Sequence, residues 1–235
     1  MQASPDAAKR NAAYAAVEHV KDGMVVGLGS GTTAAYAIIA LGERRKHQNL
    51  NILGVPSSYQ AFALAVQSGI PVTTLEEHPI LDVNIDGADQ IDPQLNLIKG
   101  MGAALCREKI VATSALQNIF IADEKKHVKE LGENGQPVPI EVVPFAIPLV
   151  RTRIQKLRGA PLLRETKGKL GPVISDNGNA IMDAMFGAIN DPALLEHQLK
   201  LVPGVVETGL FIGLTDVVYL GTDSSVRKLE RKRKP

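Results

Sequence analysis

The feature that most constrains the fold is the alternation of short apolar runs with helical stretches over about the first 130 residues. This alternation predicts parallel strands joined by crossover helices, as in an open α/β sheet. The expected elements are helix 7–20, strand 24–29, helix 32–42, strand 51–56, helix 58–68, strand 71–73, strand 82–86, helix 102–116 and strand 118–122.

A Pro- and Gly-rich segment at residues 131–139 (LGENGQPVP) indicates a boundary. The expected elements beyond it are strand 140–143, helix 145–157, strand 162–164, a hairpin turning at Asn177 and Gly178, and helix 191–201. These elements are typical of a small α+β unit. From the pattern alone they could also extend the first sheet.

Composition is that of an ordinary globular protein, with 45% hydrophobic and 22% charged residues among 235. The formal net charge of +1 gives no reason to expect nucleic acid or an acidic membrane as a partner. The one basic cluster, residues 227–234 (RKLERKRK), is interpreted as a solvated helix end. The five histidines show no metal-ligand spacing.

Cysteine usage and the absence of a leader point to the cytoplasm. Cys106 is the single cysteine, so no internal disulfide can form, which fits a reducing compartment. The N-terminal residues are polar, and no apolar stretch is long enough to cross a membrane. We therefore expect a cytoplasmic protein.

The loop after the first expected strand has features that predict an anion-binding site. The strand MVVGLG is followed by SGTT at residues 30–33, and a helix begins there. Backbone amides at a helix N-terminus attract anions, and the hydroxyls of Ser30, Thr32 and Thr33 add donors. A tight strand-to-helix connection without a ligand is the alternative interpretation.

This loop matches neither of the common nucleotide-binding motifs. Thr32 stands where a dinucleotide fingerprint has its third glycine, and the next expected strand is followed by Ser57 and Ser58 rather than by an acid. The Gly-Lys-Ser/Thr ending of a P-loop is also missing. The loop therefore suits a phosphate better than a whole nucleotide.

Residues 83–112 (VNIDGADQIDPQLNLIKGMGAALCREKIVA) concentrate charged side chains around glycines. Asp86 and Asp89 follow an apolar strand, Lys99 follows the run 95–98, and Gly100 and Gly102 are expected to open the helix that carries Glu108. One cation with three carboxylates suits a reaction that moves protons and neutralises an oxyanion. A solvated loop is the alternative interpretation.

The order of these motifs resembles that of the ribose-5-phosphate isomerase type A family. The resemblance rests on GLGSGTTA, PSSYQA, DGADQID, LIKGMGAALCREKIVA and IADEKKHV, and it continues through PVPIEVVPFA, SDNGN and VPGVVETGLF. It implies interconversion of D-ribose 5-phosphate and D-ribulose 5-phosphate in the pentose phosphate pathway, without a metal or an organic cofactor. A homodimer or homotetramer is expected.

The resemblance also implies a fold, namely a Rossmann-like open parallel sheet with a small inserted α+β domain. Residues 1–131, completed by 206–235, would form the Rossmann-like catalytic domain, and residues 132–205 the small domain. The segment 216–221 would return the chain to the main sheet.

Roles follow from the same resemblance. Glu108 matches the general base, Lys99 the group that stabilises the enediolate, and Asp86 the acid/base of ring opening. Asp89 matches a ligand of the sugar hydroxyls, and Lys126, rather than its neighbour Lys125, a ligand near the phosphate. The implied substrate-binding residues are Ser30, Gly31, Thr32, Thr33, Asp86, Gly87, Ala88, Asp89, Lys99, Gly100, Met101, Gly102 and Lys126.

The side chains around Glu108 fit that role without proving it. Its neighbours three and four residues away, Ala104, Leu105, Val111 and Ala112, are all apolar. They would place the carboxyl in poorly solvated surroundings, as suits a base that must also hold a proton near neutral pH. Arg107 has similar neighbours, so this argument does not choose between the two.

Two positions depart from the family pattern. Met101 stands where many relatives have glycine, so it would be strained if the loop required a positive φ there. Cys106 replaces a threonine and is expected to change only a packing contact.

Two other classes of function stay open at this point. A phosphosugar-sensing domain would keep the anion loop, but about twenty residues before the first strand leave little room for a DNA-binding helix-turn-helix. An acyl-transferring enzyme, such as a coenzyme A transferase, would use Glu108 as a nucleophile.

Overall fold

The computed structural model describes residues 7–231, which form two compact units. The first unit comprises the described residues up to Ala88, Arg107–His127, and those from Leu214 onward. The second comprises Asp89–Cys106 and Val128–Gly213. The second unit is thus larger than the expected small domain, because it also contains residues 89–106. The expected domain boundaries stay a prediction.

The first unit is built on a six-stranded sheet in the order β15-β14-β6-β3-β1-β2. All neighbouring strands are parallel except β15, which is antiparallel to β14. The strands are β1 Val25–Leu28, β2 Leu53–Pro56, β3 Val83–Gly87, β6 Asn118–Asp123, β14 Val217–Gly221 and β15 Val226–Glu230. The expected return of residues 216–221 to the main sheet is confirmed.

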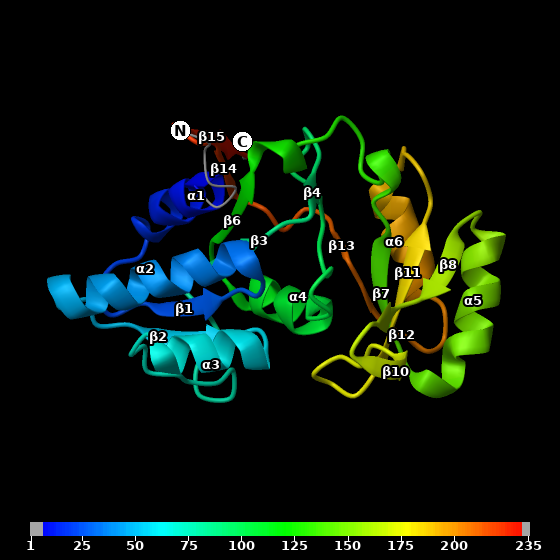
Figure 1. Ribbon diagram of the computed structural model, residues 1–235, viewed down its shortest axis with the longest axis horizontal. Helices are drawn as coiled ribbons and strands as arrows, with labels where there is room; N and C mark the ends of the chain where they lie inside the picture. The colour runs from blue at the N-terminus through cyan, green and yellow to red at the C-terminus, as the bar shows by residue number, and fades with distance from the viewer. Residues whose placement is uncertain (1–6, 232–235) are drawn as a thin grey trace. The chain divides into compact units, whose positions relative to one another are not determined.

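Helices α1 Ala7–Val17 and α2 Thr32–Gln48 pack on one face of this sheet (Figure 1). Val26 and Ile85 point to that face and belong to the same apolar core as the helices. On the other face, Val111 of α4 Leu105–Ser114 packs with Val55 of β2. Helix α3 Tyr59–Gln67 packs beside β2. The fold class predicted from the alternation of elements is therefore confirmed.

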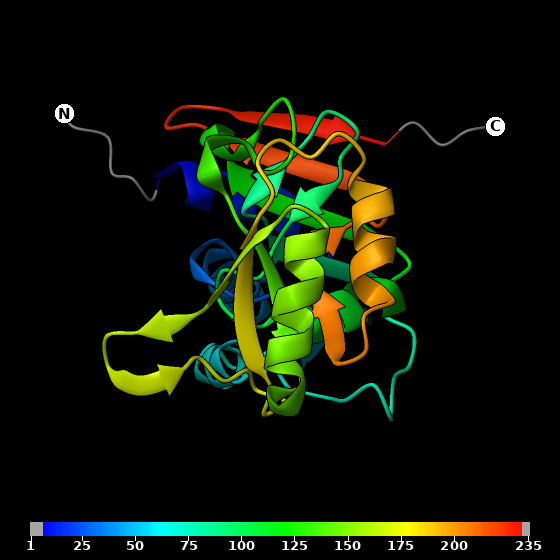
Figure 2. The same cartoon turned by 90° about the vertical axis from the view of Figure 1, so that its right-hand side faces the viewer.

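The second unit contains a four-stranded antiparallel sheet in the order β12-β7-β11-β8. Its strands are β7 Val138–Val142, β8 Ala160–Leu163, β11 Ala180–Met185 and β12 Val205–Thr208. Helices α5 Ile147–Lys156 and α6 Pro192–Lys200 cover one face of it (Figure 2). The core between them contains Ile140, Val150, Met182 and Leu199.

Short strands complete this unit. A three-stranded sheet has the order β13-β5-β4, and β9 pairs with β10. These strands are β4 Gln90–Ile91, β5 Leu97–Ile98, β9 Glu165–Thr166, β10 Lys169–Pro172 and β13 Leu210–Phe211, and the short 3-10 helices of this unit are Glu133–Gly135 and Pro144–Ala146. The expected turn at Asn177 and Gly178 is present, with Gly178 at φ +83°.

Several expected elements were wrong in extent, among them the helix expected at 32–42, which continues to Gln48, and the helix expected at 7–20, which ends at Val17. The helix expected from 102 begins at Leu105, because Gly100 and Ala103 have positive φ values that a right-handed helix does not allow. The run 95–98 pairs only from Leu97, since the Asp92 carboxylate binds the amides of Gln94 and Asn96 and forms a turn. The strand expected at 71–73 is a single bridge at Val72.

The basic cluster was also interpreted wrongly as a helix end. Its first part lies in the edge strand β15, where Arg227 and Lys228 pair with Leu220 and Tyr219 of β14. Charged side chains on an edge strand discourage pairing with another molecule. Residues 232–234 of the cluster lie outside the described part of the chain.

We expect Gly221→Ala to destabilise the first unit. Gly221 ends β14, and a Cβ there would lie 2.8 Å from the carbonyl carbon of Ala8 and 3.2 Å from the amide nitrogen of Ala12, both in the backbone of α1. Such overpacking costs about 1–3 kcal/mol. Urea denaturation should show this loss in the free energy of unfolding. Gly168→Ala, where a Cβ would meet no atom within 4 Å, is the control, and an equal loss there would contradict the argument.

Candidate active site

The polar residues that follow the parallel strands lie at one edge of the first sheet. The register pairs Leu28 of β1 with Pro56 of β2 and with Ile85 of β3, and it pairs Gly87 of β3 with Ile121 of β6. Parallel strands in this register end at the same side, which is where open α/β sheets bind ligands. The loops that follow these strands therefore lie at one edge of the sheet.

The loop after β1 is tied to its neighbours by hydroxyl and amide groups. The Ser30 hydroxyl lies 2.8 Å from the Ser57 hydroxyl and donates to the Ser58 hydroxyl at 2.6 Å. Ser58 in turn caps α3 by accepting from the amide of Ala61. The Ser30 hydroxyl is thus engaged in holding the loop, whereas sequence analysis expected it as a phosphate donor.

The start of α2 offers the features of an anion site. Gly31 is the N-cap at φ +94°, and no side chain caps the first turn of the helix. Thr32 and Thr33 lie in that turn. The amino group of Lys9, on α1, donates to the Thr32 hydroxyl at 3.4 Å. A cation, a hydroxyl and uncapped helix amides together favour a phosphate.

Lys9 was missed by sequence analysis. It is separated from Thr32 by 23 residues and lies in a helix with no motif around it. Only the packing of α1 against α2 brings the two side chains together.

Asp86 is held beside the same loop. It is 1% exposed, and its Oδ1 accepts from the amides of Ser30 at 3.1 Å and Gly87 at 2.7 Å. A Cβ at Gly29 would lie 2.5 Å from the Cα of Asp86, so only glycine allows β1 and β3 to approach here. The carboxylate and the anion loop therefore form one rigid edge.

Glu108 lies in the first turn of α4 and is 4% exposed. Val111, three residues later and on the same helical face, packs against the backbone of Gly27, where a Cβ would lie 2.6 Å from its Cγ1. Asn118, which starts β6, donates to the carbonyl of Ala112 further along α4. The helix therefore begins near the carboxyl edge of the sheet, and Glu108 faces the sheet there.

The structure distinguishes the surroundings of Glu108 from those of Arg107, which the sequence could not do. Arg107 is partly exposed, and its guanidinium lies 5.3 Å from the ring centroid of Tyr59. A cation over an aromatic ring beside solvent is a surface contact. The buried carboxyl of Glu108 is the member of this pair that can act as a base.

Lys126 lies in the short helix Glu124–Lys126 that follows β6. It is partly buried, whereas Lys125 is exposed and its amide donates to the side chain of Asp123. Lys9 and Lys125 line one pocket of about 570 Å³ at the ends of β6 and β14. The choice of Lys126 over Lys125 stays a prediction.

The second unit holds Asp89 and Lys99. Lys99 is 2% exposed, its amide donates to the carbonyl of Gly209 at 2.8 Å, and its amino group lies 5.4 Å from the ring centroid of Phe211. Asp89 accepts from the amide of Met101 at 3.1 Å. A buried amino group beside a backbone loop can stabilise a negative oxygen.

The loop after Lys99 does not require a positive φ at Met101, so this residue is not strained. Positive φ values fall at Gly100 and Ala103, and not at Met101, which is 45% exposed. A Cβ at Gly100 would lie 2.7 Å from that of Leu105, which explains the glycine there. The carbonyls of Gly100 and Met101 both accept from Arg164, a residue that sequence analysis missed.

The predicted residues thus form two groups, one on each unit. Those of the first unit are Ser30, Gly31, Thr32, Thr33, Asp86, Gly87, Ala88, Glu108 and Lys126, and those of the second are Asp89, Lys99, Gly100, Met101 and Gly102. No group of three or more metal-ligating side chains occurs within residues 7–231. No helix in that range is both long and apolar enough to cross a membrane.

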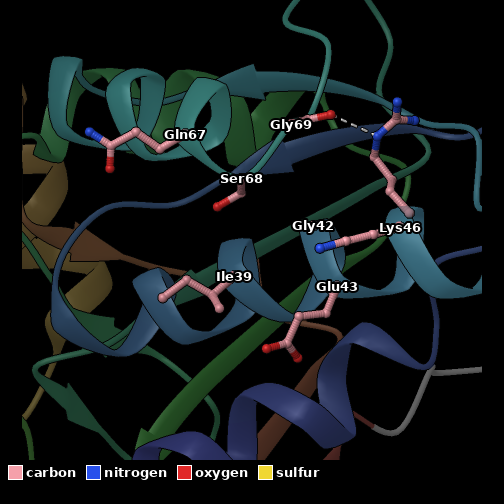
Figure 3. A pocket seen from close by; sticks show the side chains of 8 residues that line it. Ile39, Gly42, Glu43, Lys46, Gln67, Ser68 and Gly69 are labelled. Atoms are coloured by element: carbon pink, nitrogen blue, oxygen red, sulfur yellow. Dashed lines mark hydrogen bonds between the residues drawn. The ribbon is translucent and has the colours of Figure 1, made fainter.

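A second pocket, of about 470 Å³, lies between α2 and α3 (Figure 3). Its lining starts at Ile39, seven residues beyond Thr32, or roughly 10 Å further along α2. Within it, the guanidinium of Arg45 donates to the carbonyl of Gly69 at 2.9 Å. The guanidinium of Arg45 therefore joins α2 to the end of α3. The pocket is separate from the anion loop.

The comparisons with known proteins agree with this geometry. The sequence model of the family described as ribose 5-phosphate isomerase A (phosphoriboisomerase A) matches residues 53–225. The ribose-5-phosphate isomerase A of Methanothermobacter thermautotrophicus is 48% identical over 94% of this chain and 96% of its own length. That of Methanoregula boonei is 52% identical over 89% and 86%.

Solved structures show the same fold. The ribose 5-phosphate isomerase A of Methanocaldococcus jannaschii is 42% identical, with a TM-score of 0.92 over 97% of this chain and 100% of that one. A D-ribose-5-phosphate isomerase in complex with phospho-erythronic acid is 46% identical, also with a TM-score of 0.92, over 95% and 97%. With relatives this similar over nearly their full lengths, the chain belongs to the ribose 5-phosphate isomerase A family.

Proposed function

We propose that this protein is an aldose-ketose isomerase that interconverts D-ribose 5-phosphate and D-ribulose 5-phosphate through an enediolate. The observation that carries the proposal is the buried carboxyl of Glu108 at the sheet edge where Asp86 and the anion loop meet, in a chain of this family. The reaction serves the non-oxidative pentose phosphate pathway in the cytoplasm.

The phosphate binds at the start of α2. Uncapped amides of the first helical turn, the hydroxyls of Thr32 and Thr33, and the amino groups of Lys9 and Lys126 supply donors and positive charge. Phosphate held this way needs no metal ion. Ser30 and Gly31 shape the loop, since the amide of Gly31 donates to the Gln60 side chain and that of Ser30 to Asp86.

Glu108 moves the proton. An aldose becomes a ketose when a base takes the proton from C2 and returns it to C1. One carboxyl can do both steps if it is shielded from bulk water, and the 4% exposure of Glu108 supports this role. Asp86 acts as the acid/base that opens the sugar ring.

The charge that develops on the enediolate oxygen is stabilised by Lys99 and by amides of residues 100–102. Donors that are already oriented are worth most where water is excluded, and Lys99 is 2% exposed. Asp89 binds sugar hydroxyls, and Gly87 and Ala88 provide the backbone beside them. The phospho-erythronic acid in the complex of the related isomerase combines a phosphate with a carboxylate, as this arrangement would require.

Glu108→Gln should abolish most turnover. In a coupled assay that detects ketopentose phosphate formed from ribose 5-phosphate, the natural protein should be active and kcat of the variant should be lower by roughly 10²- to 10⁴-fold. Deuterium at C2 should no longer exchange with solvent. Glu76→Gln, at an exposed site, is the control. A folded Glu108→Gln protein with near-natural kcat would exclude the mechanism.

Thr32→Val and Lys126→Ala should mainly raise KM. Contacts to the phosphate lie far from the reacting carbons, so they stabilise the ground and transition states about equally. We expect KM to rise about tenfold, with kcat changed far less. Lys125→Ala is the matched control for Lys126. A rise in KM for Lys125→Ala alone, or a large fall in kcat for Thr32→Val, would reassign these residues.

The protein is a homodimer or homotetramer, by analogy with the common use of symmetric assembly among small enzymes. Light scattering at micromolar concentration should give two or four times the chain mass of 25.1 kDa. A particle of the monomer mass would contradict this expectation.

A further inference from the structure

Arg164 makes contacts that no role given above explains. It follows β8 directly, and its guanidinium pairs with Asp183 of β11, where Nε lies 2.7 Å from Oδ2 and Nη2 also binds Oδ1. The two side chains are only 12% and 16% exposed. Asp183 lies in β11, and the amide of Arg164 donates to the carbonyl of Ile181 in the same strand, so the pair is part of a rigid element.

The remaining donor of Arg164 binds the loop that follows Lys99. Its Nη1 donates to the carbonyl of Gly100 at 3.1 Å and to the carbonyl of Met101 at 2.9 Å. The sulfur of Met101 lies 3.8 Å from Nη2. One guanidinium therefore holds two consecutive peptide groups, while its other edge is fixed by Asp183.

These contacts determine which way the loop amides point. In a planar trans peptide the C=O and the N–H point in opposite directions. The peptide between Gly100 and Met101 shows this, since its carbonyl binds Arg164 and its N–H donates to Asp89. The carbonyl of the next peptide also binds Arg164, so the N–H of Gly102 points away from Arg164.

We infer that Arg164, fixed by Asp183, is a positioning residue that orients the Gly102 amide toward the enediolate oxygen and sets the Asp89 carboxylate. This inference rests on the proposed function, which places the sugar beside Asp89 and the loop. Arg164 contacts the loop residues Gly100 and Met101 and the side chain of Asp183, so it acts through the loop and not on the substrate. The charge of Asp183 offsets that of Arg164, and the clamp adds orientation without adding net charge.

Lysine cannot replace this arginine. A guanidinium has donors on two edges of one rigid plane, so it can bind a carboxylate and two carbonyls at once, whereas an ammonium group is a single point. Arg164→Lys should therefore behave almost like Arg164→Met. Asp183→Asn keeps the guanidinium and weakens only its anchor, and its effect should be smaller.

The test compares Arg164→Met, Arg164→Lys and Asp183→Asn with Arg151→Met, which removes an exposed arginine from α5. For Arg164→Met we expect kcat to fall by about 10- to 100-fold, because misplacing a catalytic group by an ångström costs about that much. KM should change less than about threefold, because the phosphate contacts are intact. In Arg164→Met, phospho-erythronic acid should inhibit more weakly, in proportion to the fall in kcat. Inhibition by inorganic phosphate should be unchanged.

A second readout does not depend on activity. The amide chemical shifts of Met101 and Gly102 should move in Arg164→Met and stay in place in Arg151→Met, with urea denaturation confirming that both proteins are folded. Unmoved shifts, or kcat within threefold of the natural value, would overturn the inference. If the natural protein proves inactive, the proposed function fails, whereas the shifts still decide whether Arg164 orients the loop.

Discussion

The close approach of β1 and β3 at their carboxyl ends is the constraint on which the first half of the site depends. Gly29 has no side chain to separate the strands, so the Asp86 carboxylate reaches the amide of Ser30 across the gap. On the other side of β1, Ser57 and Ser58 follow the neighbouring strand β2, and their hydroxyls meet the Ser30 hydroxyl. Any larger residue at position 29 would displace the carboxylate and the anion loop together.

Gly27, two residues before Gly29, also allows a close approach that a side chain would block. Its missing side chain leaves room for Val111, which brings α4 close to the sheet and places Glu108 over its edge. Position 27 faces α4, whereas Val26 and Leu28 on either side face the core beneath α1 and α2. Alternate residues of one short strand therefore serve the site on one face and stability on the other.

Sequence periodicity was enough to predict the fold class because the parallel strands are short, apolar and regularly spaced. It failed where local turn chemistry overrides an apolar run, as at Leu95, where the Asp92 carboxylate forms a turn. It also misread the C-terminal basic segment, since charged residues in an edge strand have no apolar alternation that would reveal the strand.

The site was predictable only where its residues cluster in sequence. Asp86, Asp89, Lys99 and Glu108 lie within one short segment, so their residue types could be interpreted together. Lys9 and Arg164 could not be found in this way, because each reaches its partner from a distant part of the chain, 23 residues away for Thr32 and 64 for Gly100. The residues next to Lys9 and Arg164 in sequence form no motif that would predict these contacts.

The loop after Lys99 shows how a bulky residue fits where a glycine was expected. The reversal of the chain is made by positive φ values at Gly100 and Ala103, and so Met101 keeps an ordinary backbone. Ala103 is the residue that bears the conformational cost, of the order of 1 kcal/mol for a left-handed alanine. The hydrogen bonds of Arg164 to the two carbonyls before it offset that cost and hold the reversal in place. The loop therefore depends on a distant ion pair rather than on three consecutive glycines.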